Sequence, residues 1–300
     1  MTTPPPTLCI AEASARDGAT RSICEVEGHA IAYVEAGRGP AVLLIHGALT
    51  NLDDMVLGPF QALARDHRVL AFDRPGHGES PRLRLADASP WRQAELIHAA
   101  ACDLGAESPV VVGHSFGGAV ALAYGMSFPQ ETRGVLALAP IVWPEPRLEL
   151  AAFGMRAMPG PGDILAACAS GTVDHATLPL LWRAMFLPQA MPPHFQDGFS
   201  FDRASAPQTT LSTGEDAFAI VTALWRSVAA YPSCRTPVSI LGGDCDLVIN
   251  NALHGLALSG VLPDGRFKFV RGMGHMLHHF AIDEVLAAVR ALEATAAMPV

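Results

Sequence analysis

The chain is poor in lysine, in aromatic side chains and in charge of either sign. Lys268 is the only lysine among 20 basic residues, charged residues make up 16% of the 300 residues, and aromatic residues make up 7%. The formal net charge of −9 argues against nucleic acid or an anionic membrane surface as a partner. Because 50% of the residues are hydrophobic, the chain can build a large core, and disorder is excluded for most of its length.

Several sequence patterns are also absent, and each absence excludes a class of protein. No apolar run approaches the roughly 18 residues that a membrane span needs. The first residues lack the basic and apolar regions of a secretory signal. Neither G-x-x-x-x-G-K-[ST] nor a G-x-G-x-x-G after a strand occurs, so nucleotide cofactors are not indicated. These absences predict a soluble cytoplasmic protein that needs no cofactor.

The cysteines follow no spacing that binds a metal or forms a redox pair. No C-x-x-C occurs, which excludes zinc-ribbon and thioredoxin-like motifs. We expect mostly buried thiols in a reducing compartment, because a chain of this size does not need disulfides to fold. The six cysteines are Cys9, Cys24, Cys102, Cys168, Cys234 and Cys245.

From residue 22 onward, segments that suit strands alternate with segments in which apolar residues have helical spacing. This alternation predicts an α/β fold with a mostly parallel sheet. Strands are expected at 22–27 and 29–35 (a hairpin), 41–45, 69–72, 109–112, 135–139, 238–241 and 266–270. Helices are expected at 53–65, 90–104, 116–128, 215–230, 250–259 and 276–294, with Ser89 as the N-cap of the second.

The alternation is interrupted between two of the expected sheet strands. Residues 143–213 contain short helical pieces cut by prolines, no strand pattern, and much of the chain's methionine and phenylalanine. The segment is either an ordinary satellite core or a lid over a pocket. We therefore divide the chain into a loose N-terminal arm (1–20), a core (21–142 and 214–300) and an inserted helical lid (143–213).

The sharpest chemical signal is Gly113-His-Ser-Phe-Gly117, followed by Gly118. It lies directly after an apolar strand and directly before a helix. A G-x-S-x-G pattern at such a turn presents its serine above the sheet, and the glycines prevent a collision across the turn. Ser115 is therefore the candidate nucleophile.

The chain resembles the α/β-hydrolase-fold serine hydrolases, in particular the lidded group of esterases, lipases, perhydrolases and carbon–carbon bond hydrolases. The resemblance covers about residues 22–294. It rests on Leu44-Ile-His-Gly-Ala48, Asp73-Arg-Pro-Gly-His-Gly-Glu-Ser80, the turn at 113–117 and Gly272-Met-Gly-His275. The serine at position 115 argues against the members of this fold that use a carboxylate nucleophile.

The resemblance implies the order nucleophile, acid, base along the chain. His275 is then the general base, on a loop after the last strand. The acid follows the strand at 238–241, where the family's Gly-x-x-Asp pattern points to Asp246, with Asp244 as the alternative and Glu145 as a remote third. His278 and His279 are interpreted as surface or packing residues. A metal site formed by these histidines would need a carboxylate, and we predict none.

The resemblance also nominates two backbone amides for the oxyanion. They belong to Phe116, directly after the nucleophile, and to Ala48, with Leu49 as the near alternative. We expect His46 to brace that loop, and we expect Arg74 and His77 to be structural.

The predicted activity is hydrolysis of an ester or related acyl bond of a small apolar substrate. Two alternatives stay open. One is a carbon–carbon bond hydrolase, lyase or perhydrolase that uses the same triad, and the other is a non-catalytic ligand receptor, since fold does not fix function. Candidate pocket residues are Leu49, Trp143, Phe153, Met158, Trp182, Met185, Phe186 and Met276.

Overall fold

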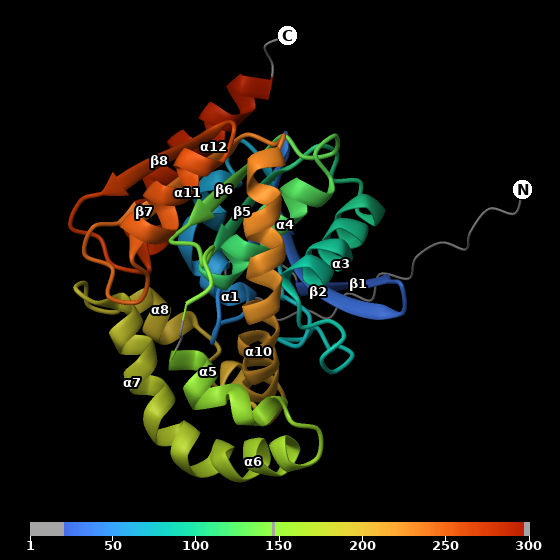
Figure 1. Cartoon of the computed structure of the whole chain (residues 1–300), viewed down its shortest axis with the longest axis vertical. Coiled ribbons are helices and arrows are strands. Elements are labelled where there is room, and N and C mark those ends of the chain that lie inside the picture. Colours follow the sequence, from blue (N-terminus) through green and yellow to red (C-terminus); the bar gives the residue numbers. More distant parts are fainter. Residues whose placement is uncertain (1–20, 146–147, 297–300) are drawn as a thin grey trace, which may run out of the picture.

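The computed structural model describes residues 21–145 and 148–296, and an eight-stranded sheet lies at its centre (Figure 1). The spatial order is β1-β2-β4-β3-β5-β6-β7-β8. The pairings β1–β2 and β2–β4 are antiparallel, and all the others are parallel. The strands are β1 (Arg21–Val26), β2 (His29–Ala36), β3 (Ala41–Ile45), β4 (Arg68–Phe72), β5 (Val110–His114), β6 (Gly134–Leu138), β7 (Val238–Gly243) and β8 (Gly265–Val270). The prediction of an α/β fold with a mostly parallel sheet is confirmed. The predicted arm at 1–20 lies outside the described residues.

Helices cover both faces of the sheet. One face packs against α3 (Pro90–Asp103), α4 (Phe116–Ser127), α10 (Pro207–Ala230) and α11 (Ala257–Val261). The other face packs against α1 (Leu52–Met55), α2 (Gln61–Leu63) and α12 (Ile282–Ala296). Because β3, β5 and β6 are covered on both sides, they are buried at every position, which explains their continuous apolar sequences.

The helix expected at 53–65 is interrupted. The structure has α1, then a wide turn η1 (Val56–Phe60), then α2. Gly58 has non-helical angles, φ −95° and ψ −115°. Pro59 follows it, and proline disfavours the helical conformation of the residue before it and provides no N–H. By contrast, α3 begins as predicted, with the Ser89 hydroxyl accepting the Trp91 N–H.

Between β6 and β7 the chain forms a group of helices beyond one end of the sheet (Figure 1). The described residues of this segment contain helices, turns and connecting loops but no strand. The helical elements are α5 (Leu148–Phe153), η2 (Gly154–Ala157), α6 (Pro161–Ala169), η3 (Ser170–Asp174), α7 (His175–Phe186), α8 (Pro193–Gly198) and α9 (Phe201–Ala204).

Helix α10 begins earlier than the sequence indicated. It runs unbroken from Pro207, whereas the predicted helix started at residue 215, after the predicted insertion had ended. The first turns are rich in Ser, Thr and Gly, so they carry no apolar periodicity. These polar residues are nevertheless buried, and the Ser212 carbonyl accepts a hydrogen bond from Arg82. Buried polar contacts therefore stabilise a helical start that an apolar pattern cannot reveal.

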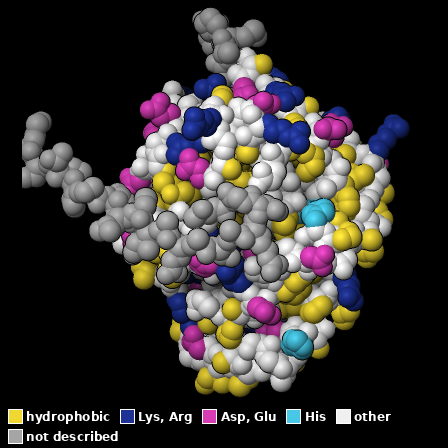
Figure 2. Space-filling model, turned by 180° about the vertical axis from the view of Figure 1, so that it is seen from behind, with side chains coloured by type: hydrophobic (Ala, Val, Ile, Leu, Met, Phe, Trp, Pro, Cys, Tyr) yellow, Lys and Arg dark blue, Asp and Glu magenta, His cyan; other side chains and the backbone are white. Residues whose placement is uncertain are grey.

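The helices between β6 and β7 expose many large apolar side chains. Ile164, Val173 and Leu180 are 67%, 60% and 62% exposed, and yellow side chains reach the surface at this end of the molecule (Figure 2). By length and composition alone, the helical run Pro161–Phe186 is long and apolar enough to cross a membrane, and little of it is buried. No uninterrupted apolar stretch marks this run in the sequence.

The single helix expected at 276–294 is two elements, a short turn η6 (Leu277–His279) and α12. The expectation that the cysteines are mostly buried is wrong for the described residues. Cys24 and Cys234 are buried, and Cys102, Cys168 and Cys245 are exposed. Cysteine is small and can lie at the surface at little cost. The scattered positions of the cysteines in the sequence therefore did not indicate which of them are buried.

Candidate active site

Ser115 stands at the turn between β5 and α4. Its backbone angles, φ 53° and ψ −114°, lie at positive φ, which a residue with a side chain adopts only under constraint. The residue is 4% exposed. A constrained serine between a buried strand and a helix is the arrangement that G-x-S-x-G predicts.

Close backbone approach explains the glycines around Ser115. A Cβ on Gly113 would overlap the backbone of Gly117 across the turn. A Cβ on Gly117 would overlap the carbonyl oxygens of Ile45 and His46 at the end of β3. The absence of these side chains therefore lets the turn bring Ser115 against the loop that follows β3.

His275 and Asp246 come from the loops after β8 and β7, and their side chains meet. His275 Nδ1 lies 3.0 Å from Asp246 Oδ2, and both side chains are buried. Asp246 Oδ1 accepts the backbone N–H groups of Val248 and Ile249, at 2.8 and 2.9 Å. Burial alone would raise the pKa of the Asp246 carboxyl, but the His275 ring beside it holds that pKa below its ordinary value. An ionised Asp246 accepts Nδ1–H, which leaves Nε2 as the proton acceptor.

The two alternative acids have other partners. Asp244 Oδ1 accepts the backbone N–H of Gly272, so it fastens the loop after β7 to the loop after β8. Glu145 Oε1 lies 3.0 Å from His254 Nε2. Of the three carboxylates, only Asp246 forms a hydrogen bond with His275 within the described residues.

Ser115 and His275 lie in neighbouring segments but are not directly hydrogen-bonded in the described part of the chain. His114, the residue before Ser115, donates its Nε2–H to the backbone carbonyl of His275 at 3.1 Å. The ring centroids of His114 and His275 are 4.7 Å apart. Catalytic hydrogen bonds are often long without substrate and tighten when it binds, so this placement is compatible with proton transfer from Ser115.

The proposed oxyanion donors border one small cavity. Phe116 is the first residue of α4, where backbone N–H groups have no partner within the helix. Ala48 lies in the loop after β3, beside Leu49, which has a φ of 58°. A cavity of about 20 Å³ is lined by Ala48, Phe116, Ile141, Thr213, Asp216, Ala217 and Ile220.

Arg74 holds the loop that carries Ala48. Its guanidinium donates to the carbonyls of His46 and Gly47, at 3.1 and 3.0 Å, and its backbone N–H donates to His46 Nε2. It also donates to Asp216 Oδ2 at 2.7 Å, and His77 Nε2 lies 2.9 Å from the same oxygen. Burial and the nearby Arg74 lower the pKa of His77 to about 4, so His77 is neutral and donates. The loop is therefore fixed by a buried charge pair rather than by packing alone.

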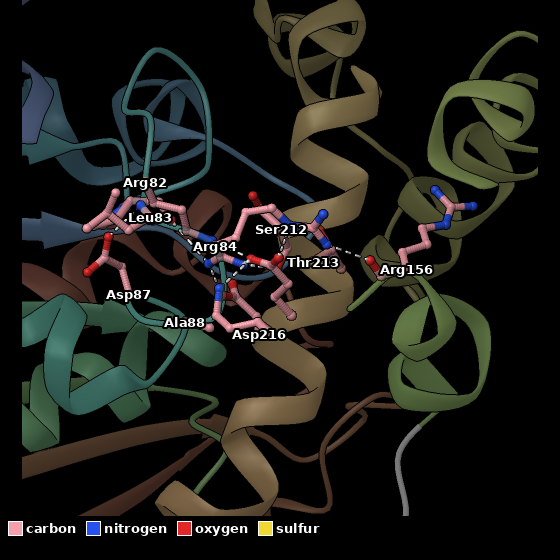
Figure 3. Close-up of polar contacts among 12 residues, drawn as sticks. Arg82, Leu83, Arg84, Asp87, Ala88, Arg156, Ser212, Thr213 and Asp216 are labelled. Carbon is pink, nitrogen blue, oxygen red and sulfur yellow. Dashed lines mark hydrogen bonds and ion pairs between the residues drawn. The ribbon is translucent and has the colours of Figure 1, made fainter. Parts of the chain in front are cut away.

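Further ion pairs extend from Asp216 toward the helices between β6 and β7 (Figure 3). Arg82 bonds to both Asp216 and Glu215, and all three side chains are buried. Arg84 bonds to Glu215 and to Asp163 in α6. Two neighbouring acidic residues of α10 thus connect the loop after β4 with the helical segment.

Replacing Asp216 should lower the free energy of unfolding and make it depend less on pH in the acid range. Burial alone would raise the pKa of Asp216, but Arg82 and Arg74 hold it well below its ordinary value of 3.8. A depressed folded-state pKa gives stability that is present above pH 3.8 and lost as the pH falls further. We expect Asp216→Asn to lose about 3–5 kcal/mol at pH 7. Urea unfolding at pH 7 and pH 3 measures both effects, and an equal loss at the two pH values would contradict the assignment.

Asp216, Arg82 and Glu215 were not predicted from the sequence. The signal that could have identified the acidic pair is Glu215-Asp216 directly before the apolar part of a helix, since charged residues are almost never fully buried without partners. Their partners lie more than 120 residues away in the sequence, for example 142 residues between Arg74 and Asp216. No local pattern therefore names the partner.

The predicted pocket residues separate into two groups. Leu49, Phe153, Met185 and Met276 join Trp182 and Phe186 in one apolar cluster between the helical segment and the site. Trp182 Nε1–H also donates to the Leu49 carbonyl at 2.8 Å. The prediction is not supported for Trp143, which packs against Tyr231 in the main core, or for Met158, which is 49% exposed. A separate cavity of about 320 Å³ is lined by Trp182 together with Leu178, Met191 and Phe201.

His278 and His279 were interpreted as surface or packing residues, and their burial agrees with packing. Both are buried and both lie within hydrogen-bond distance of Asp54, at 3.0 and 2.8 Å. A carboxylate does therefore lie beside these histidines. It was missed because Asp54 is 224 residues before His278.

Comparisons with known proteins identify a family and a shared fold. The model of the alpha/beta hydrolase family matches residues 42–288. An uncharacterised protein of Mycobacterium tuberculosis is 27% identical over 266 residues, which cover 85% of this chain and 75% of that protein. A 2-hydroxy-6-oxo-6-phenylhexa-2,4-dienoate hydrolase of Burkholderia cepacia is 29% identical over 111 residues, or 35% of this chain and 38% of that protein.

A solved structure of a thermophilic esterase from Thermogutta terrifontis superimposes with a TM-score of 0.69. The alignment covers 97% of this chain and 100% of the esterase, at 18% sequence identity. At that identity the likeness establishes a shared fold.

Proposed function

The chain belongs to the alpha/beta hydrolase family, and from this premise we propose that it is a serine hydrolase. Its substrate is a carboxylic ester, or a related acyl compound, of small apolar character. The observation that carries the proposal is the arrangement of three loops. A constrained serine follows β5, while the loops after β7 and β8 bring Asp246 and His275 into contact.

The proposed reaction uses an acyl-enzyme. His275 Nε2 takes the proton of the Ser115 hydroxyl as Ser115 attacks the acyl carbon. The backbone N–H groups of Phe116 and Ala48 stabilise the oxyanion. His275 then protonates the leaving group. In the second half of the reaction His275 takes a proton from water as the water attacks the acyl carbon, and it returns that proton to Ser115 as the acid leaves. Asp246 holds Nδ1–H and stabilises the imidazolium, so no cofactor takes part.

Carbon–carbon bond hydrolysis is the second candidate, and the similarity to the Burkholderia cepacia hydrolase favours it. Such a reaction would use the same Ser115 and His275. A panel of p-nitrophenyl esters of increasing acyl length, run beside vinylogous 1,5-diketones with mass detection of products, separates the two. Turnover of esters alone supports the proposal, turnover of diketones alone replaces it with the second candidate, and turnover of neither contradicts both.

We further propose that residues 143–213 act as a lid over an apolar substrate pocket. The support is the apolar cluster that joins Phe153, Trp182 and Phe186 of this segment to Leu49 beside the site. We also propose a cytoplasmic location, which the free thiols of Cys102, Cys168, Cys234 and Cys245 support.

The lid proposal predicts a change in selectivity rather than in chemistry. Met185 is partly buried against the apolar cluster, whereas Met155 is 64% exposed on the same segment. We expect Met185→Ala to shift the preferred acyl length and to change KM about three- to tenfold, with kcat nearly constant. Met155→Ala is the matched control and should change neither. If Met185→Ala leaves selectivity and KM unaltered, the segment serves packing only.

A further inference from the structure

Four buried side chains form a second polar cluster behind the candidate triad. Asp54 lies in α1, His114 at the end of β5, and His278 and His279 in η6. All four are buried, His279 at 7% exposure and the others at 0%. Asp54 Oδ1 lies 3.0 Å from His278 Nε2 and 2.8 Å from His279 Nε2. We call this group the Asp54 cluster.

The pattern of hydrogen-bond partners decides which protons the cluster holds. His278 Nδ1 and His279 Nδ1 are buried and have no partner. If Nε2 of each ring bound a metal, each Nδ1 would carry a buried N–H without an acceptor, which ligating histidines almost always avoid. If each Nε2–H donates to Asp54, each Nδ1 is a bare lone pair, which costs less when unpaired. The donor set of one carboxylate and two imidazoles therefore fits hydrogen bonding better than metal binding.

Asp54 is the anion of the cluster. Burial alone would raise its pKa, but the His278 and His279 rings hold it well below its ordinary value. One carboxylate oxygen thus accepts two hydrogen bonds, and charge-assisted bonds of this kind are the stronger class. The lid side of His279 is covered by the Phe186 and Phe195 rings, at 5.4 and 5.2 Å between centroids, and His194 lies 5.9 Å away.

The Asp54 cluster is connected to the candidate base through His114. The His114 ring lies 4.3 Å from the His278 ring and 4.7 Å from the His275 ring, between centroids. Its Nε2–H donates to the His275 carbonyl, as described above. Its Nδ1 lies 3.9 Å from Asp54 Oδ2, which is a close approach but too long for a hydrogen bond, and neither atom has a hydrogen-bond partner. The backbone is therefore held at the His275 carbonyl and again three and four residues later, at His278 and His279.

The break in the helix at Gly58 also makes room for this cluster. The kink at Gly58 lies directly against His278, and a Cβ on Gly58 would stand 3.1 Å from His278 Cδ2 and 3.3 Å from its carbonyl oxygen. The helix after Asp54 is thus interrupted where His278 packs. An uninterrupted helix with a larger residue would push η6, and with it the loop that carries His275.

We propose that Asp54, acting with His114, His278 and His279, is a positioning residue that fixes His275 relative to Ser115. The inference rests on the proposed serine hydrolase function and adds a residue to it. Asp54 follows the loop of Ala48, His114 precedes Ser115, and the two histidines follow His275. The cluster therefore contacts all three segments, whose relative positions must be maintained for proton transfer from Ser115 to His275.

Two substitutions at Asp54 test the proposal in the full chain with a p-nitrophenyl ester. Asp54→Ala removes the acceptor, and we expect kcat to fall about 10- to 100-fold while KM changes less than about threefold, because small displacements of a catalytic group have effects of this order. Asp54→Asn keeps an oxygen where the two Nε2–H groups converge, and we expect it to restore kcat to within about fivefold of the parent. Phosphonate labelling of Ser115 should slow in the same order.

Asp87→Ala is the matched control. Asp87 is also a buried carboxylate, 2.9 Å from His29 Nε2, and it lies in the loop before α3. It should lose thermal stability comparable to Asp54→Ala but keep kcat. If Asp54→Ala does not fold, His114→Phe removes the donor to the His275 carbonyl without removing a charge. We expect that variant to lower kcat about fivefold or more.

Three results would overturn the inference. They are a folded Asp54→Ala or His114→Phe enzyme with kcat within about twofold of the parent, an equal loss of kcat in Asp87→Ala, or no difference between Asp54→Asn and Asp54→Ala. Ser115→Ala is assayed in parallel. If that variant keeps its activity, the proposed function itself has failed, which is a different outcome from failure of the positioning role.

Discussion

Ser115→Ala is expected to abolish nearly all turnover while the protein stays folded. The loss should be about 10⁴ to 10⁶ in kcat, the range that removal of a serine nucleophile produces in enzymes with a triad. KM should change little, because the hydroxyl contributes little to binding of the substrate before attack. The residue is buried at a constrained turn, so a smaller side chain fits there without collision.

The matched control is Ser239→Ala, in strand β7. Ser239 is also buried, at 8% exposure, and it lies away from the turn. It should keep kcat within about twofold, since a strand hydroxyl away from the turn has no part in the chemistry. Full activity of Ser115→Ala on the same ester, in a variant whose thermal midpoint is unchanged, would contradict the nucleophile assignment.

Asp246→Asn is expected to have the second largest effect, a loss of about 10² to 10⁴ in kcat. The amide keeps the shape of the carboxylate but can hold the imidazole in the tautomer that cannot accept the serine proton. In a serine protease the same change costs about 10⁴. The lower limit here allows for a neighbouring carboxylate that partly substitutes for the missing one.

Asp244→Asn is the matched control, two residues away on the same loop. Its oxygen accepts the Gly272 N–H, a bond that an amide oxygen can also accept. It should therefore cost little in kcat. If Asp244→Asn is the impaired variant, the acid has been assigned two residues too far along the loop. If both variants remain active, the acid lies elsewhere, and Glu145 becomes the residue to change.

Much of the fold follows from local sequence, because its central strands are buried on both faces. The continuous apolar run at 41–45 coincides with β3, and the capping pair Ser89-Pro90 marks the start of α3. The start of α10 could not be predicted, since its first turns are polar and are stabilised by Arg82 from another part of the chain. The break between η6 and α12 was missed for a related reason. His279 turns inward to Asp54, and no periodicity records that contact.

The candidate site divides in the same way. Ser115 and its glycines are contiguous, so the sequence contains the whole turn, and the resemblance to a family supplied His275 and Asp246. Arg74–Asp216 and Asp54–His278 join residues 142 and 224 positions apart. Each partner is ordinary in its own segment. Only the fold brings the charges together, and only burial makes their pairing necessary.

The most direct test of the central claim is covalent labelling of the native protein with an aryl alkylphosphonate, followed by intact mass measurement and peptide mapping. The account predicts one adduct per chain, located on Ser115, with no adduct in Ser115→Ala. It also predicts that the rate of labelling falls in Asp246→Asn and not in Asp244→Asn. An adduct on another serine, or equal labelling of Ser115→Ala, would contradict the account.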